Sequence, residues 1–212
     1  MEFKNILIPK TQKQKYQGLT EKDTTEITIY HQNTDRISNK IDRLNALLST
    51  LKPNVVVLTE HGQKETTLAN TRLMGYSLKT AFCRENYKKG GVAIYTQDLM
   101  EGQSEAVAFQ DISIEMVCEV TSLKITVGKT SLFIVGIYRN HGNLEEGLEV
   151  LSEALETISA ENCPTILIGD INIDCLADRN DNDKLRDTLN SFNMYRIDLT
   201  PTRLYSCVTN IN

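Results

Sequence analysis

The chain has 212 residues, a net charge of −5 at pH 7, an isoelectric point near 5.3 and a 40% share of hydrophobic residues. This length and composition predict one globular domain with a large core. The acidic balance argues against a protein that coats nucleic acid through bulk positive charge, although a local patch together with a metal ion could still hold a few phosphates.

The cysteines argue against two common scaffolds. There are five, an odd number, they are widely spaced, and no C-x-x-C pair occurs. Neither a disulfide framework nor a zinc site is indicated, and we expect reduced thiols in an intracellular protein. The sequence carries no recognisable targeting signal and no apolar run of about 18 residues, so we expect no membrane span.

Residues 1–25 are polar and aperiodic, and we expect a flexible leader there, in which the short segment KNILIPK is either disordered or an edge strand. From residue 26 onwards, alternating and helical patterns predict regular elements. Strands are expected at residues 26–33, 54–60, 75–83, 90–96, 112–120, 123–127, 131–139 and 165–172. Helices are expected at residues 38–51, with Ser38 as the N-cap, at 144–158 and at 182–194. Strands mixed with helices at irregular intervals favour an α/β sandwich with antiparallel sheets over a strictly alternating parallel sheet.

Polar side chains recur where the buried strands end. They are Asn33, Glu60, Tyr138, Asp170 and Asn172. A rigid strand holds a functional group in a fixed position, and several strands of one sandwich can place their groups in one cleft. Carboxylate and amide oxygens suit a hard cation such as Mg²⁺. A single such residue is more often a turn or cap residue, so the prediction of one cleft depends on the recurrence.

Two local patterns have competing interpretations. The segment DINID matches the D-x-N-x-D start of a calcium loop, but Cys175 occupies the position of the sharp-turn glycine, and a strand precedes the segment. The segment RENYKKGG carries Arg84, Lys88 and Lys89 and is either a solvated hairpin turn or a loop that faces phosphate.

Five segments in this order resemble the endonuclease/exonuclease/phosphatase superfamily. They are HQNTDRISNKIDRLNALLSTLKPNVVVLTEHG, FCRENYKKGGVAIY, IVGIYRN, ILIGDINID and PTR. They are most similar to the apurinic-endonuclease-like domain of non-LTR (LINE-type) retrotransposons, over residues 26–212.

The resemblance implies a two-sheet β-sandwich flanked by helices, of the deoxyribonuclease-I-like kind. It also implies a nuclease that uses Mg²⁺, or Mn²⁺ in its place, to hydrolyse a phosphodiester of DNA. In a retroelement the nick leaves a 3′-hydroxyl that primes reverse transcription. The implied partners are DNA and a reverse transcriptase domain of a longer polyprotein, and the implied place of action is the nucleus.

The resemblance also assigns roles to the strand-end residues. Glu60 would bind the metal ion, and Asn33 would help to position it. Asp170 would orient and deprotonate the attacking water, Asn172 would hold the phosphate or the water, and Tyr138 would touch the phosphate. These roles supply the base and the positive charge that phosphodiester hydrolysis requires.

Further residues are assigned to the surroundings of the site. Arg203, in PTR, and the three cations of the basic loop, Arg84, Lys88 and Lys89, are expected to face DNA. Asp174 is expected to support the loop that carries Asp170 and Asn172.

The sequence departs from the family pattern near its end. Thr209 stands where an aspartate is expected, and no Ser-Asp-His triplet occurs. We therefore expect a domain that is incomplete at its C-terminus, lacks its final strands and cuts slowly or not at all. Two alternatives stay open: a catalytically impaired remnant that only binds, and a phosphatase or phosphodiesterase of the same superfamily.

Overall fold

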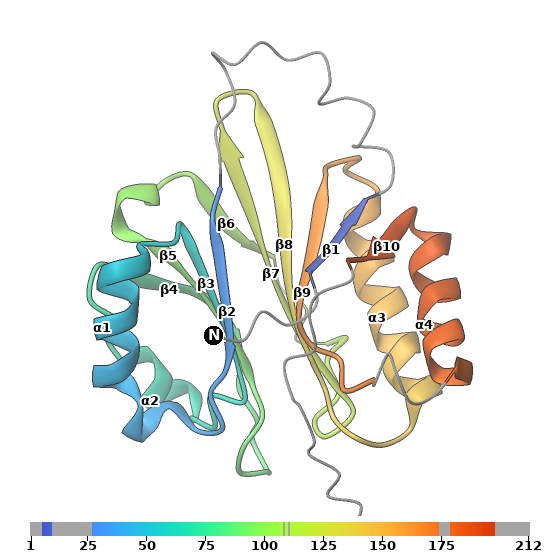
Figure 1. Ribbon diagram of the computed structural model, residues 1–212, viewed down its shortest axis with the longest axis horizontal. Coiled ribbons are helices and arrows are strands. Elements are labelled where there is room, and N and C mark those ends of the chain that lie inside the picture. The colour runs from blue at the N-terminus through green and yellow to red at the C-terminus, as the bar shows by residue number, and fades with distance from the viewer. Residues whose placement is uncertain (1–5, 10–26, 108, 110, 174–178, 198–212) are drawn as a thin grey trace, which may run out of the picture.

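The computed structural model describes residues 6–9, 27–107, 109, 111–173 and 179–197. Within this part of the chain two β-sheets pack face to face, and helices cover their outer faces (Figure 1). The predicted two-sheet α/β sandwich is confirmed. No helix in the described part of the chain is long and apolar enough to cross a bilayer.

The smaller sheet has four strands and a parallel pair at one edge. In spatial order the strands are β2 (Ile29–Asn33), β3 (Val55–Thr59), β5 (Val92–Gln97) and β4 (Tyr76–Phe82). β2 and β3 run parallel because helix α1 (Ile41–Leu51) returns the chain between them. Helix α2 (Glu65–Ala69) lies on the same outer side as α1 (Figure 1). Both strands of the parallel pair therefore end at the same edge of the sheet.

The larger sheet has six strands. In spatial order they are β10 (Met194–Arg196), β1 (Ile6–Pro9), β9 (Thr165–Asp170), β8 (Thr130–Arg139), β7 (Cys118–Val127) and β6 (Ser104–Val107). β8 and β9 are parallel, joined by helix α3 (Leu144–Ser159), which packs with α4 (Arg179–Ser191) on the outer face (Figure 1). The ends of β8 and β9 thus lie side by side.

Burial explains why the two sheets stack. β3 is the apolar segment VVVLT, and all five of its residues are buried. Val57 and Ile94 of the smaller sheet share one apolar cluster with Ile134 and Ile168 of the larger sheet. A cluster of this kind removes the facing side chains from water and fixes the distance between the sheets. The strand ends of both sheets are consequently held rigidly against each other.

The observed elements differ from the predicted ones in several places. The helix expected at 38–51 begins as a 3-10 turn, η3 (Ile37–Asn39), and becomes α-helical at Ile41, so Ser38 is not its N-cap. The strands expected at 112–120 and 123–127 are one strand, β7, because the chain turns before Cys118 and then runs straight. Strand β6, helix α2 and a second 3-10 turn, η4 (Asp98–Met100), were not expected, since such short elements carry little periodicity.

The expectation of a flexible leader over residues 1–25 needs one correction. Ile6–Pro9 form strand β1, which pairs with both β9 and β10. Four residues are too few to show an alternating pattern, and their conformation is determined by two partners more than 150 residues away in the chain. The remaining leader residues lie outside the described part of the chain.

Candidate active site

Asn33 joins the two sheets at their strand ends. It is the last residue of β2, and its Nδ2 group donates to Glu60 Oε1 at 2.6 Å and to Asp170 Oδ2 at 2.8 Å. Its own Oδ1 accepts the backbone N–H of Asp35 at 3.1 Å, which fixes the orientation of the amide. One amide group therefore holds two carboxylates that come from opposite sheets.

Tyr138 completes this group from strand β8. It lies directly beside Asp170 in the parallel β8–β9 pairing, and its phenol lies close enough to Glu60 for the carboxylate charge to act on it. Burial, and then the negative charge of Glu60, raise the pKa of the Tyr138 phenol well above its usual value, although the positive charge of Arg84 opposes this. The phenol therefore stays protonated at neutral pH and can donate a hydrogen bond.

Glu60 and Asn172 both adopt left-handed backbone conformations, with φ of 52° and 50°. Such values cost non-glycine residues about 1–2 kcal/mol each, so the surrounding structure must enforce them. Asn172 is held by Arg139: its Nδ2 donates to the Arg139 carbonyl at 2.6 Å, and its own carbonyl accepts from Arg139 Nη2 at 2.9 Å. Arg139 Nε also donates to the Ile171 carbonyl at 2.8 Å. Arg139 thus holds the turn that follows Asp170.

Four of the five strand-end residues lie together, and the fifth, Asn172, lies next to this group. Asn33, Glu60, Tyr138 and Asp170 contact one another directly or through Asn33. Asn172 follows Asp170 by two residues, but the side-chain hydrogen bond described for it leads to the backbone of Arg139. Three residues named from the sequence, Asp174, Arg203 and Thr209, lie outside the described residues.

Arg84 does not lie on the open surface where a DNA-facing residue was expected. Only 5% of it is exposed, and its Nε forms a buried ion pair with Glu119. Lys88 and Lys89 are exposed as expected, and Lys89 Nζ lies 3.5 Å from Asp35. The local sequence around Arg84 resembles a polar turn, which does not predict burial. Its partner, Glu119, is 35 residues further along the chain.

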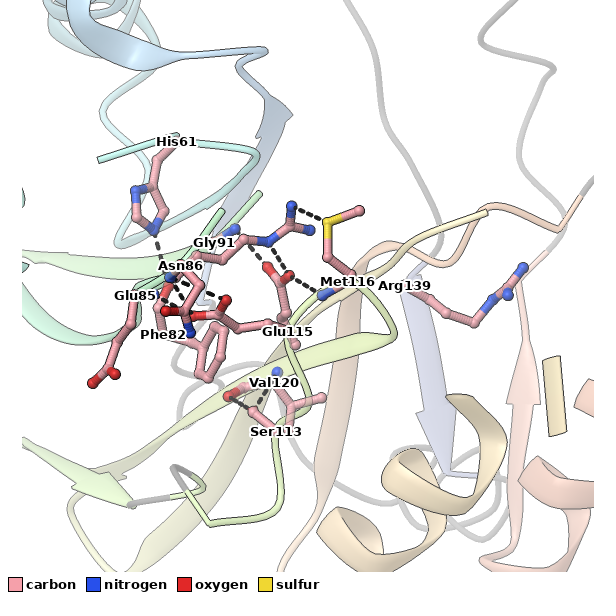
Figure 2. A network of polar contacts seen from close by, with 12 residues as sticks. His61, Phe82, Glu85, Asn86, Gly91, Ser113, Glu115, Met116, Val120 and Arg139 are labelled. Carbon is pink, nitrogen blue, oxygen red and sulfur yellow. Dashed lines mark hydrogen bonds and ion pairs between the residues drawn. The ribbon is translucent and has the colours of Figure 1, made fainter. Parts of the chain in front are cut away.

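The basic loop that follows β4 is anchored by its backbone. Figure 2 shows Glu115 reaching the backbone N–H groups of Glu85 and Asn86, and Lys64 Nζ donates to the carbonyls of Arg84 and Glu85. The Gly62 N–H donates to the Gly90 carbonyl at 2.9 Å, which ties the loop to the segment just after Glu60. The loop therefore presents its lysines from a fixed backbone close to the carboxylates.

His61, next to Glu60, has a structural role. The ring is fully buried, and its Nε2 donates to the Phe82 carbonyl at 3.0 Å (Figure 2). Its Nδ1 accepts the Gln63 N–H at 3.2 Å. Burial lowers the pKa of His61 to about 4. The ring is neutral at pH 7, and both nitrogens are used in holding the chain beside Glu60.

The donor set fits a hard divalent cation. Glu60 and Asp170 place two carboxylates at one amide, in a partly buried position where a cation would offset their mutual repulsion. Among the described residues no group of three or more His, Cys, Asp or Glu side chains could hold a metal ion. One or two carboxylates are what Mg²⁺ uses when water and substrate phosphate complete its shell. Asn33 turns its NH₂ towards the carboxylates and therefore orients them; it does not offer an oxygen to the ion.

Two residues of this region were not identified from the sequence. Arg139 follows Tyr138 directly and holds the Asn172 turn, and Glu119 holds Arg84. Glu119 is a fully buried charge within an apolar strand segment, which is a visible sequence signal, because such a charge requires a partner. Nothing in the local sequence around Arg139 distinguishes it from a surface arginine.

No family model and no curated protein matches this sequence. Solved structures do resemble it. The endonuclease domain of TRAS1, a telomere-specific non-LTR retrotransposon, matches with a TM-score of 0.60 and 14% identity, over 78% of this chain and 72% of that chain. AP endonuclease LMAP from Leishmania major matches with a TM-score of 0.56 and 16% identity, over 78% and 64%.

A third structure is D. rerio TDP2, complexed with a single-strand DNA product. It matches with a TM-score of 0.53 and 17% identity, over 75% of this chain and 66% of that chain. The match thus spans just under two thirds of the TDP2 and LMAP chains. Identities this low establish the fold alone. The chain therefore has the deoxyribonuclease-I-like fold that these solved structures share.

Proposed function

We propose that this chain is the DNA endonuclease domain of a non-LTR retrotransposon and that it nicks a phosphodiester with an activated water and a divalent cation. The observation that supports it most is the hydrogen bonding of Asn33 Nδ2 to Glu60 and Asp170, which assembles two carboxylates from opposite sheets. The likeness in fold to the TRAS1 endonuclease domain supports the choice of reaction and of biological setting.

The residues of the site have complementary roles in this proposal. Glu60 would hold Mg²⁺, or Mn²⁺ in its place, with Asp170 next to it. The bound cation supplies a positive charge that stabilises the developing negative charge on phosphate oxygens. Asp170, oriented by Asn33, accepts a proton from the attacking water. Tyr138 stays protonated and donates a hydrogen bond to a phosphate oxygen, and Asn172 flanks the same position.

The test is nicking of a supercoiled plasmid with Mg²⁺ and with EDTA. The wild-type chain should produce open circles only with the cation, and it should do so slowly, because Thr209 stands in place of the expected aspartate. Asp170→Asn should slow nicking by about 10²- to 10⁴-fold, the usual worth of a general base. Asp187→Asn, which changes an exposed aspartate of α4, is the matched control and should leave the rate unchanged.

The outcomes separate the proposal from its alternatives. DNA binding without nicking, at any cation concentration, would contradict the proposal and identify a binding module. Nicking that Asp170→Asn leaves unchanged would show that another group activates the water. Release of phosphate from monoesters without cleavage of DNA would identify a phosphatase.

A role in a retroelement also requires a particular chemical group at the 3′ end of the nick. Priming of reverse transcription needs a 3′-hydroxyl at the nick, and a polymerase can extend such an end without prior phosphatase treatment. We expect direct extension of the nicked plasmid. A requirement for phosphatase treatment would exclude the priming role, and with it the proposed link to a reverse transcriptase.

A further inference from the structure

Three neighbouring strands of the larger sheet place Glu119, Tyr138 and Asp170 in one row. Glu119 pairs with Tyr138 in the β7–β8 register, and Tyr138 pairs with Asp170 in the β8–β9 register. Residues in one row project from the same face of a sheet, so all three point towards the smaller sheet. The buried ion pair of Glu119 and Arg84 is therefore one strand away from the phenol and two strands away from Asp170.

The guanidinium of Arg84 lies over the Tyr138 ring, with Cζ 5.7 Å from the ring centroid. Its Nε pairs with Glu119, and its Nη1 contacts Met116 Sδ at 2.9 Å. Its Nη2 is buried and has no hydrogen-bond partner among the described residues. A buried cationic N–H without an acceptor is costly, whereas the face of an aromatic ring attracts a cation at this distance. The ring of Tyr138 therefore accounts for the position of this end of Arg84.

The surrounding chain packs closely against Arg84 and Glu119. A Cβ atom at Gly90 would lie 2.1 Å from Arg84 Cζ, so the guanidinium occupies space that only a glycine leaves open. The Gly91 N–H donates to Glu119 Oε2 at 2.5 Å, and the Met116 N–H donates to Glu119 Oε1 at 3.3 Å (Figure 2). Glu119 is thus fixed by backbone donors from two loops, and it fixes Arg84 in turn.

We propose that Arg84, held by Glu119, is a positioning residue that keeps the ring of Tyr138 in the orientation that places its hydroxyl beside Glu60 and Asp170, where it would donate to a bound phosphate. The proposal rests on the proposed function, because it assigns Arg84 to the Tyr138 hydroxyl that would donate to the phosphate. Arg84 acts through the tyrosine and does not touch DNA itself, which agrees with its 5% exposure. A purely structural ion pair would stabilise the fold but would leave the ring orientation unchanged.

The test needs a variant that removes the cation without leaving a buried charge. Arg84→Met/Glu119→Gln does so, and the new carboxamide retains one oxygen, which can still accept from the Gly91 N–H. Arg84→Lys keeps the charge and serves as the conservative variant. The matched control is Lys124→Met, because Lys124 Nζ on β7 also lies 5.7 Å from a ring centroid, that of Phe133 on the same strand as Tyr138.

The first readout is ¹⁹F NMR of protein labelled with 3-fluorotyrosine. The resonance of position 138 is identified by its loss in Tyr138→Phe. We expect one dominant ring orientation in the wild type, and a shifted or divided resonance in the double variant. Arg84→Lys should fall in between, and Lys124→Met should leave this resonance unchanged. An unchanged resonance in a folded double variant would overturn the proposal.

The second readout is nicking kinetics. The double variant should lose at least about tenfold in kcat, with KM for DNA changed less than about twofold, since the phenol is misplaced but the DNA-facing lysines remain. A loss confined to KM would overturn the proposal, because it would show that Arg84 serves binding. If the ring resonance shifts but the wild-type chain never nicks, the positioning contact is supported and the proposed function is overturned.

Discussion

Asn33 reduces the electrostatic repulsion between the carboxylates of Glu60 and Asp170. Its NH₂ group offers partial positive charge to Glu60 and Asp170, and its carbonyl is fixed by the Asp35 N–H. An aspartate has almost the same shape but no donor. Substitution at this position therefore tests the electrostatics of the site with little change of packing.

Asn33→Asp should destabilise the protein in EDTA and make it more responsive to Mg²⁺. Lost hydrogen bonds to charged groups, and a third carboxylate, should lower the free energy of unfolding by about 2–3 kcal/mol. Because a cation that binds only the folded state stabilises it, added Mg²⁺ should restore more stability to the variant than it adds to the wild type. Thermal unfolding in EDTA and in Mg²⁺ measures both effects.

Asn162→Asp, an exposed substitution just after α3, is the control. Its thermal stability should match that of the wild type both in EDTA and in Mg²⁺. Equal gains from Mg²⁺ in the wild type and in Asn33→Asp would show that the cation does not bind between these carboxylates.

At the scale of elements, the connection between β4 and β5 is the segment most constrained by the site. It carries Arg84 inward and ends in two glycines, Gly90 and Gly91, with φ of +72° and +86°. A Cβ at Gly90 would overlap the guanidinium of Arg84, and a Cβ at Gly91 would lie 2.2 Å from His61 Nε2. The glycines are therefore needed for space as well as for backbone conformation.

Gly90→Ala should lower the free energy of unfolding by about 2–4 kcal/mol, through backbone strain and overpacking together. Gly75→Ala separates the two causes, because Gly75 has a similar φ of +79° but open space around it, and it should lose only about 1 kcal/mol. Urea denaturation midpoints give the comparison. Equal losses in the two variants would mean that Arg84 can move aside without cost.

Charge is a property of the whole molecule, and here it opposes binding to DNA. The net charge is −5, so any DNA affinity must come from local cations such as Lys88 and Lys89 on the anchored loop. Lys88→Ala/Lys89→Ala should weaken binding irrespective of DNA sequence and reduce the slope of log K against log salt by about 1–2. Fluorescence anisotropy over a salt series measures both quantities.

The control removes the same amount of charge elsewhere. Lys52→Ala/Lys129→Ala takes two exposed lysines from the end of α1 and from the β7–β8 turn, and it lowers the net charge by the same two units. If both double variants weaken binding equally, the effect is one of net charge, and the loop has no special role.

The sequence was sufficient to predict the sandwich and the set of strand-end residues, because both follow from local patterns. VVVLT and TILIGD are buried strands by composition, and Glu60 and Asp170 follow or end them. The placement of Arg84 could not be predicted, since its burial depends on Glu119 in another strand and on the space left by Gly90. The position of strand β1 inside the larger sheet could not be predicted for the same kind of reason, as its partners lie at the far end of the chain.

The hydrogen bond between Asn33 and Asp170 joins residues that are 137 positions apart, and this has a consequence for the nascent chain. A ribosome adds about 5–20 residues per second, so roughly 7–30 s separate the synthesis of the two side chains. Over that interval the smaller sheet can form and can bring Asn33 next to Glu60, but the second carboxylate does not yet exist. A growing chain therefore has only half of the candidate site, and the hydrolysis proposed for it could begin only once strand β9 has left the exit tunnel and paired with β8.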